Sequence, residues 1–223
     1  MTRIYIVRCL IIAVSLGLWY LTQWLLSRRP LPAGNELSGG ISDGIHRLTI
    51  SSNERLVKHP RRADGLLIAS SLVMDLLGCY LLLSAIFGST IEPFFGLLVI
   101  FALRQICQAL SPLPTRTGMI WRDPGFPTIL VTYGTANDLF FSGHTAIAVF
   151  GAAIIATAFG PIGVAVGIAI AVFEIAAVLL LRAHYTMDVF TGAITALYVH
   201  RLTMDWAPTV DQWIGHVAGM VGR

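Results

Sequence analysis

The sequence predicts an all-α, polytopic membrane protein in which six transmembrane helices form one bundle. Hydrophobic residues make up 56% of the 223 residues and charged residues only 12%, whereas a soluble domain has about 25% charged residues. A spanning helix needs about 20 predominantly apolar residues. The candidate spans are Ile4–Leu26, Gly65–Phe87, Pro93–Leu110, Phe140–Phe159, Pro161–Leu181 and Tyr185–Thr203. They leave little chain for a soluble domain, so we expect residues 1–223 to form a single membrane domain.

The first and third spans need the most justification. Arg3 and Arg8 could belong to a secretory signal peptide, but the apolar run is too long and ends in "SRRP" rather than at a small-residue cleavage site. We therefore expect a helix. The third span is short and contains Arg104. Pro161 divides the fourth and fifth spans, since proline suits a first helical turn and disrupts a helix interior.

Two polar connections are long enough to contribute to function. Residues 27–64 begin with a Gly/Pro/Asn-rich half, for which we expect a loop, and end with a half that could form a short helix in the membrane interface. Residues 111–137 are rich in Pro, Gly and Thr and lead into the "SGHT" stretch, residues 142–145. With six spans, the SGHT stretch and the "HYTMD" stretch, residues 184–188, open onto the same membrane face.

The chemistry of these two stretches follows from their spacing. His184 and Asp188 are four residues apart, so on a helix they lie on one face, and the carboxylate can orient one imidazole nitrogen while the other acts as nucleophile or base. Ser142 is a favourable N-cap, and Gly143 follows it in a first turn whose free N–H groups favour a phosphate. His144 would stand beside that phosphate as a general acid or base. A single interfacial histidine is typical of a polar residue near water, but two in this arrangement favour catalysis.

These residues resemble the sphingomyelin synthase family, a branch of the phosphatidic-acid phosphatase type 2 superfamily. "SGHT" followed by "HYTMDV" matches the family's motifs, and Asp138 resembles its acidic residue six positions before the first histidine. "LRQICQALSPLP", residues 103–114, resembles the family's third-helix element. "RPLPAG", residues 29–34, is faintly similar to a "PPLPD" element. The resemblance covers residues 101–202, the expected catalytic core elements, and extends to the first hundred residues only in topology.

Departures from the broader lipid phosphatases favour a phosphodiester substrate. Those enzymes carry a "KxxxxxxRP" element and an Arg six residues before the last histidine, a position occupied here by Val178. A dianionic phosphomonoester needs more positive charge than a phosphodiester.

The resemblance implies a two-step phosphoryl transfer. His184, oriented by Asp188, would attack the phosphorus of a phospholipid, and His144 would protonate the departing diacylglycerol. A lipid alcohol or water would then accept the headgroup phosphate from His184. No metal or other cofactor is expected, and Cys9, Cys79 and Cys107 lack metal-ligand spacing.

Further polar residues are candidates for substrate binding, because intramembrane charges are costly and often functional. Arg104 and Arg182 could contact phosphate or snorkel to headgroups. Glu174 could hold a cationic headgroup, pair with an arginine or pack beside a buried partner. Asp138 could favour a cationic headgroup. Thr145 and Tyr185 are candidates as members of the two motifs.

The expected function is therefore an integral-membrane phospholipid headgroup phosphotransferase or phosphodiester hydrolase. The alternatives are a phosphatase of phosphatidate-like or isoprenoid phosphates, and a transport or scaffold protein that keeps the fold without turnover. The net charge is only +3, and the basic residues flank the expected spans. This pattern indicates membrane lipids rather than nucleic acid as partners. A homo-oligomer is compatible with the sequence.

Two arguments about the orientation of the chain in the membrane conflict. The resemblance places the active site on the exoplasmic side, with both termini cytosolic. The first long connection carries seven basic residues, which the positive-inside rule would place in the cytoplasm: Arg28, Arg29, Arg47, Arg55, Lys58, Arg61 and Arg62. We favour the exoplasmic side.

Overall fold

The fold is entirely helical within the part of the chain that the computed structural model describes, residues 2–28, 43–111, 118–129, 133 and 140–220. Helices contain 84% of these residues, and no strand occurs among them. The helices are α1 (Thr2–Ser27), α2 (Gly44–Leu48), α3 (Ile50–Lys58), α4 (Pro60–Phe87), α5 (Glu92–Leu110), α6 (Gly143–Leu180) and α7 (Thr186–Met220). The expected all-α class is confirmed.

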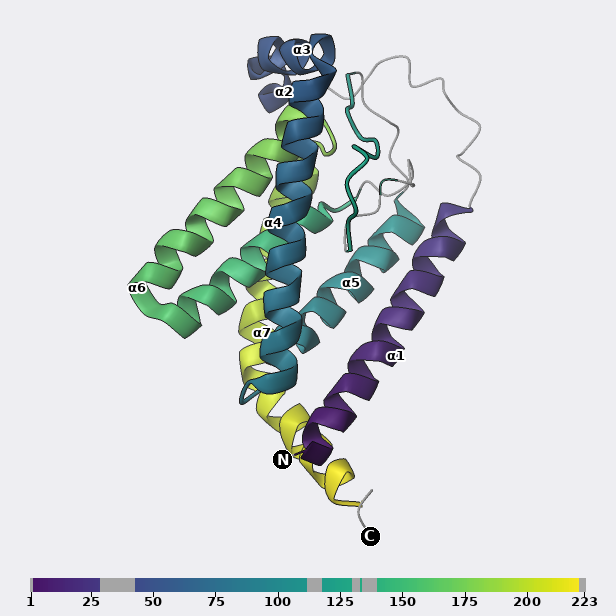
Figure 1. The fold of residues 1–223 in the computed structure, drawn as a ribbon, viewed down its shortest axis with the longest axis vertical. Coiled ribbons are helices and arrows are strands. Elements are labelled where there is room, and N and C mark those ends of the chain that lie inside the picture. Colours follow the sequence, from purple (N-terminus) through teal and green to yellow (C-terminus); the bar gives the residue numbers. More distant parts are fainter. Residues whose placement is uncertain (1, 29–42, 112–117, 130–132, 134–139, 221–223) are drawn as a thin grey trace.

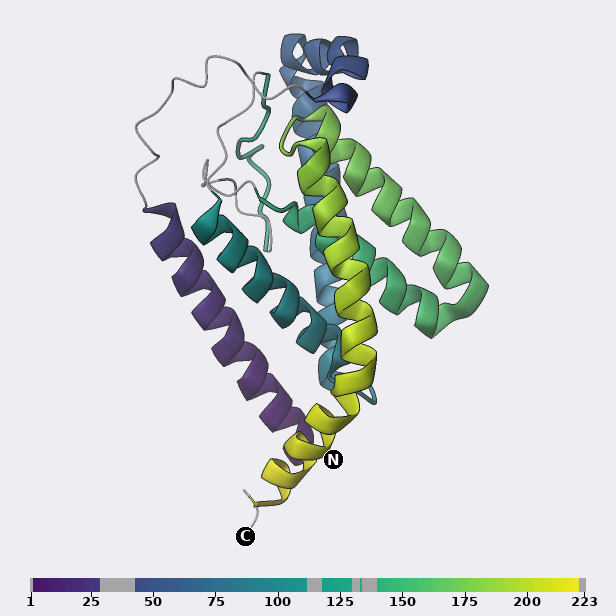
Figure 2. The same cartoon turned by 180° about the vertical axis from the view of Figure 1, so that it is seen from behind.

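The long helices form a bundle, and the two short helices lie across one end of it. Figure 1 shows α2 and α3 at the end opposite the N- and C-terminal ends of the chain. Helix α7 contacts α1, α5 and α6, while α4 contacts α5 and α6. Figure 2 shows from behind that α7 runs along much of the length of the bundle.

Helix α6 is a hairpin of two helical halves. Its 38 residues are interrupted at Gly160, which has φ 57° and ψ −137°, and Pro161 follows. Glycine adopts such a positive φ without strain, and proline suits the start of the next helix. The chain reverses at this point, and the second half runs back beside the first (Figures 1 and 2). The expected fourth and fifth spans are the two halves of α6.

The helices indicate an integral membrane protein, but they do not confirm a count of six spans. Four of the described helices, α1, α4, α5 and α6, are long and apolar enough to cross a membrane. Helix α7 is not among them. It continues to Met220, beyond the expected end at Thr203, and this extension carries Asp205 and Asp211.

The second half of the connection at 27–64 contains α2, α3 and the start of α4. Asp43 caps α2, and its carboxylate accepts a hydrogen bond from the His46 N–H at 3.1 Å. Helix α3 continues almost directly from α2 and leads into α4. Residues 29–42, including "RPLPAG", lie outside the described ranges.

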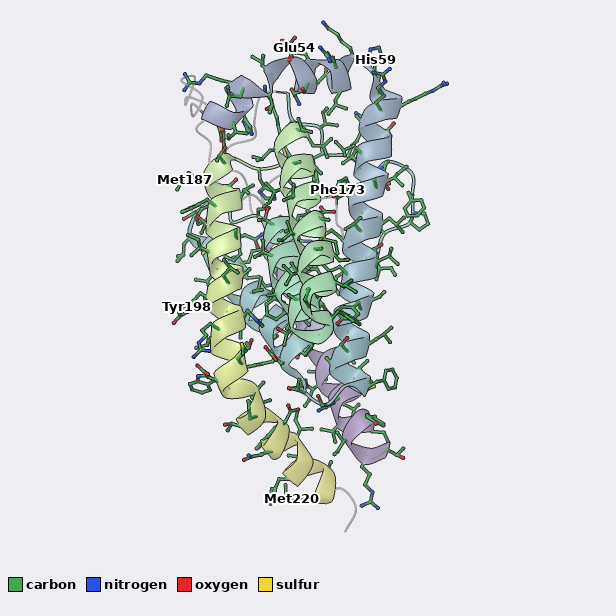
Figure 3. The ribbon with its side chains drawn as sticks, turned by 90° about the vertical axis from the view of Figure 1, so that its left-hand side faces the viewer. Glu54, His59, Phe173, Met187, Tyr198 and Met220 are labelled. Carbon is green, nitrogen blue, oxygen red and sulfur yellow. The ribbon has the colours of Figure 1, made fainter. Side chains whose placement is uncertain are left out.

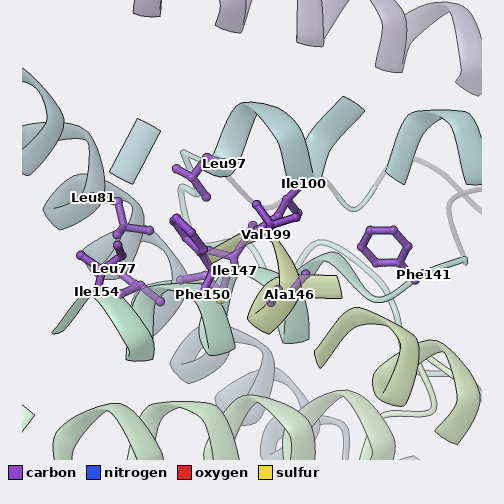
Figure 4. Packing of buried hydrophobic residues seen from close by; sticks show 12 residues of the cluster. Leu77, Leu81, Leu97, Ile100, Phe141, Ala146, Ile147, Phe150, Ile154 and Val199 are labelled. Carbon is purple, nitrogen blue, oxygen red and sulfur yellow. The ribbon is translucent and has the colours of Figure 1, made fainter. Parts of the chain in front are cut away.

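The main core lies between α4, α5, α6 and α7. Ile100, Phe141, Phe150 and Val199 are at most 1% exposed and pack in one cluster (Figure 4). Between membrane helices such contacts stabilise mainly through close van der Waals packing, because lipid is itself apolar. Phe141 and Phe150 flank the SGHT stretch, so the core fixes the start of α6 in the bundle.

Candidate active site

The starts of α6 and α7 meet directly. The backbone N–H of Ser142, just before α6, donates a hydrogen bond to the carbonyl oxygen of Asp188 at 3.1 Å. Both residues are buried, with 0% and 1% exposure. The SGHT and HYTMD stretches therefore occupy one site, although about 40 residues of the α6 hairpin separate them.

Ser142 caps α6 as its residue type predicts. Its Oγ accepts hydrogen bonds from the Thr145 N–H at 3.3 Å and from the Thr145 hydroxyl at 3.0 Å. Thr145 is fully buried, and the hydrogen bond from its hydroxyl to Ser142 stabilises the cap. The N-terminus of α6 keeps the partial positive charge that makes a helix start favourable for an anion.

Asp188 contacts both the His184 ring and the backbone at the start of α7. Its Oδ2 lies 3.5 Å from Nδ1 of His184 and accepts a hydrogen bond from the Tyr185 N–H at 2.9 Å. The second contact is one half of a capping box, in which an acidic side chain at the third helical position binds the N-cap N–H. The His184 and Asp188 side chains are 5% and 2% exposed. The carboxylate thus favours a proton on Nδ1, which places the lone pair of the His184 ring on Nε2.

His144 lies close enough to His184 and Arg104 for the charges of the three side chains to interact. The rings of His144 and Trp121 are nearly perpendicular, with centroids 5.3 Å apart. The Nε2 atom of His144 is buried and has no hydrogen-bond partner within the described part of the chain. A buried nitrogen without a partner is unfavourable in a finished core, and it is available to a ligand.

Arg104 brings a positive charge from α5 to the start of α6. Its Nε donates a hydrogen bond to the carbonyl oxygen of Phe141 at 3.0 Å. The guanidinium lies so close to Gly143 that a Cβ there would be 2.9 Å from Nε. The start of α6 and the Arg104 guanidinium therefore lie close together, a combination that favours an anion such as phosphate.

The structure adds two residues that sequence reasoning missed, Asp43 and His46. The Asp43 carboxylate accepts hydrogen bonds from the Thr186 N–H at 2.6 Å and the Thr186 hydroxyl at 2.7 Å. His46 Nε2 lies 3.0 Å from the carbonyl oxygen of His184. Helix α2 therefore holds the turn that carries His184. The only local signal in the sequence is the Asp43–Gly44 pair before a short helical pattern. This pair predicts a cap for α2, but it does not predict that the same carboxylate also contacts the start of α7.

Two candidate binding residues in the same turn contact α2. Arg182 has a positive φ of 53° and donates a hydrogen bond to the carbonyl oxygen of His46 at 3.2 Å. The Tyr185 ring stacks on the His46 ring, with centroids 5.8 Å apart. These contacts stabilise the turn, and they give no evidence for phosphate binding by either side chain.

Glu174 lies in a polar cluster against α4. Its Oε2 accepts a hydrogen bond from the Ser70 hydroxyl at 2.7 Å, while Oε1 is buried without a partner in the described ranges. Tyr133 bonds to Ser71 beside it, and burial raises the pKa of the Tyr133 phenol. Of the three expectations for Glu174, packing beside a buried partner fits these contacts. Asp138 lies outside the described residues.

A family model described as "PAP2 superfamily C-terminal" matches residues 135–205. The match spans 71 of the 223 residues and contains both histidines and Asp188. It supports placement in the phosphatidic-acid phosphatase type 2 superfamily. No curated protein and no solved structure shows a significant match. The superfamily match indicates phosphoryl-transfer chemistry on lipids in general, without distinguishing the sphingomyelin synthase branch.

Proposed function

We propose that the protein is an integral-membrane enzyme that transfers or hydrolyses phospholipid headgroups through a phosphohistidine intermediate, as sphingomyelin synthases do. The observation that supports this most is the hydrogen bond between Ser142 and Asp188, because it joins the two histidine-bearing helix starts. Such a transfer requires an oriented nucleophile, a general acid or base, and positive charge beside the phosphate. The candidates for these groups are His184 beside Asp188, His144, and Arg104 beside the start of α6.

In the first step, His184 is the nucleophile. With its proton on Nδ1, toward Asp188, the lone pair of Nε2 attacks the phosphorus of the donor lipid. A P–N bond forms as the P–O bond to diacylglycerol breaks, and protonated His144 transfers its proton to the departing oxygen. Arg104 and the first turn of α6 stabilise the negative charge on the phosphoryl oxygens.

In the second step, a hydroxyl of a lipid alcohol or water attacks the same phosphorus. His144, now neutral, accepts the hydroxyl proton as general base. The P–N bond breaks, and its electron pair returns to Nε2 of His184. The acceptor decides whether the product is a new phosphodiester or a free phosphorylated headgroup.

For the membrane topology we propose six crossings, counting the two halves of α6 separately and including α7. Six crossings place both termini on the same side of the membrane. From the resemblance to sphingomyelin synthases we propose that this side is cytosolic and that the active site is exoplasmic. The N- and C-terminal ends of the chain lie at the same end of the bundle (Figure 1), which is compatible with an even number of crossings.

Labelled lipids test the reaction. Purified protein is incubated with phosphatidylcholine, phosphatidylethanolamine or phosphatidate, each with and without ceramide. We expect released or transferred headgroup phosphate from a phosphodiester lipid, and loss of this turnover in His184→Ala and His144→Ala variants that remain folded.

The other outcomes identify the alternatives. Inorganic phosphate released from phosphatidate would support the phosphatase, which the general superfamily match also accommodates. No turnover of any lipid would favour the transport or scaffold protein. Near-wild-type activity in either histidine variant would remove the site assignment.

A further inference from the structure

Helices α2 and α3 form a surface segment whose buried side chains are hydrogen-bonded to the rest of the protein. Figure 3 shows the segment, with Glu54 and His59 labelled, across the end of the bundle where α7 begins near Met187. From α3, the buried side-chain amide of Asn53 donates hydrogen bonds to the carbonyl oxygens of Gly118 at 3.0 Å and Leu180 at 2.9 Å. The segment is therefore a fixed part of this end of the molecule.

The exposed side chains of this segment and of the first turn of α4 are basic and apolar. Five basic side chains and one acidic side chain, Glu54, are exposed between residues 47 and 62; the basic ones are Arg47, Arg55, Lys58, Arg61 and Arg62. Large apolar side chains are exposed among them, with Leu48 at 81%, Ile50 at 51% and Val57 at 53%. Basic and apolar side chains on one short helical segment are typical of helices that lie in an anionic membrane interface.

A groove adjoins this surface at the start of α7. It has a volume of about 530 Å³, and its lining includes Arg47, Leu48 and Met187. Asp43 also lines it, with its carboxylate hydrogen-bonded to Thr186 and His46. Leu48 and Met187 are both more than 60% exposed. The groove thus offers a cation for a headgroup phosphate and apolar side chains for the adjoining acyl region.

We propose that α2 and α3 bind anionic phospholipids at the membrane surface, with a headgroup phosphate at Arg47. The bound lipid stabilises the turn that carries His184, because Asp43 and His46 connect α2 to that turn. The binding does not depend on which reaction the active site performs. It also explains the basic residues of α2 and α3 without requiring the first long connection to be cytoplasmic.

Lipid-dependent stability tests the proposal. The thermal unfolding temperature of the full chain in non-ionic detergent is measured while phosphatidylglycerol, phosphatidylcholine or soluble glycerol phosphate is added. We expect stabilisation by phosphatidylglycerol only. Each basic residue near an anionic surface strengthens binding by about fivefold, so Arg47→Gln/Arg55→Gln/Lys58→Gln should weaken the apparent affinity for phosphatidylglycerol by roughly 100-fold.

The matched control is Arg3→Gln/Arg201→Gln, which removes exposed arginines away from the α2–α3 surface and should leave the phosphatidylglycerol response unchanged. In the wild type, 1 M salt should abolish the response, since it screens charges beyond about 3 Å. This second measurement remains informative if the triple variant does not fold. Equal stabilisation by both lipids, an unchanged response in the triple variant or at high salt, or stabilisation by glycerol phosphate alone would overturn the proposal.

Discussion

At the scale of single residues, Asp188 contacts both the proposed nucleophile and the start of α7. It lies 3.5 Å from Nδ1 of His184 and accepts the Tyr185 N–H. Asp188→Asn can keep the second contact through its amide oxygen but loses the charge that favours the imidazolium. We expect turnover to fall by roughly 10²- to 10⁴-fold, with a melting temperature close to that of the wild type.

A comparison of kcat with KM separates this positioning role from a purely structural one. If Asp188 orients the His184 ring for attack, Asp188→Asn should lower kcat with little change in KM, because the lost contact acts on the chemical step rather than on lipid binding. An unchanged kcat with a raised KM would show that Asp188 supports only the helix start.

Gly143 is the second residue at which a small change should have a large effect. A Cβ at this position would lie 2.9 Å from Nε and 3.1 Å from Cζ of Arg104, whereas a Cβ at Gly65 of α4 would meet nothing within 4 Å. Gly143→Ala should displace the guanidinium and lower kcat/KM by roughly tenfold to a hundredfold. Gly65→Ala is the control, and equal activities in the two variants would argue against Arg104 as a phosphate ligand.

At the scale of elements, Asp43 joins the starts of α2 and α7. Asp43→Ala removes the hydrogen bonds to His46 and Thr186, and the loss of a cap typically costs about 0.5–2 kcal/mol of the free energy of unfolding. The control is Asp64→Ala, which removes an exposed pair with Arg122 and should cost less than about 1 kcal/mol. Unfolding by SDS in mixed micelles measures both values.

The contribution of Asp43 should also depend on pH. Burial raises its pKa, but the hydrogen bonds from Thr186 and His46 outweigh burial and hold the pKa of Asp43 below its ordinary value. The stabilisation is therefore complete above the ordinary Asp range, about pH 4, and is lost as the pH falls through the lowered value. The stability difference between wild type and Asp43→Ala should shrink in acid, and a constant difference would contradict the assignment.

The elements also show which parts of the structure were predictable. The spacing of His184 and Asp188, the cap at Ser142 and the break before Pro161 are local features, because each depends on residues at most four apart. The contacts of Asp43 and His46 with the His184 turn join residues about 140 apart in sequence, which no local pattern encodes. For the same reason, the bond from Ser70 to Glu174 and the position of Trp121 against His144 could not be derived from the sequence.

At the scale of the whole molecule, an ion pair connects the helices at the end of the bundle away from the candidate active site. Arg8 of α1 is 5% exposed and donates hydrogen bonds to Asp211 of α7 at 2.8 Å and to the carbonyl oxygens of Ala85, Gly88 and Ser89. Asp211 also accepts the Ile91 N–H. The pair therefore connects α1, the α4–α5 connection and α7, whereas α2 and the turn that carries His184 lie at the other end.

Arg8→Met should destabilise the protein without changing the chemistry. It leaves a partly buried carboxylate without its cation, for which we expect a loss of about 3–5 kcal/mol in the free energy of unfolding. The control is Arg201→Gln, whose exposed pair with Asp205 is 4.0 Å long and should contribute less than about 1 kcal/mol. Because Arg8 is remote from His144 and His184, kcat per folded molecule should match the wild type. A loss of kcat in fully folded Arg8→Met would instead mean that the two ends of the bundle are coupled.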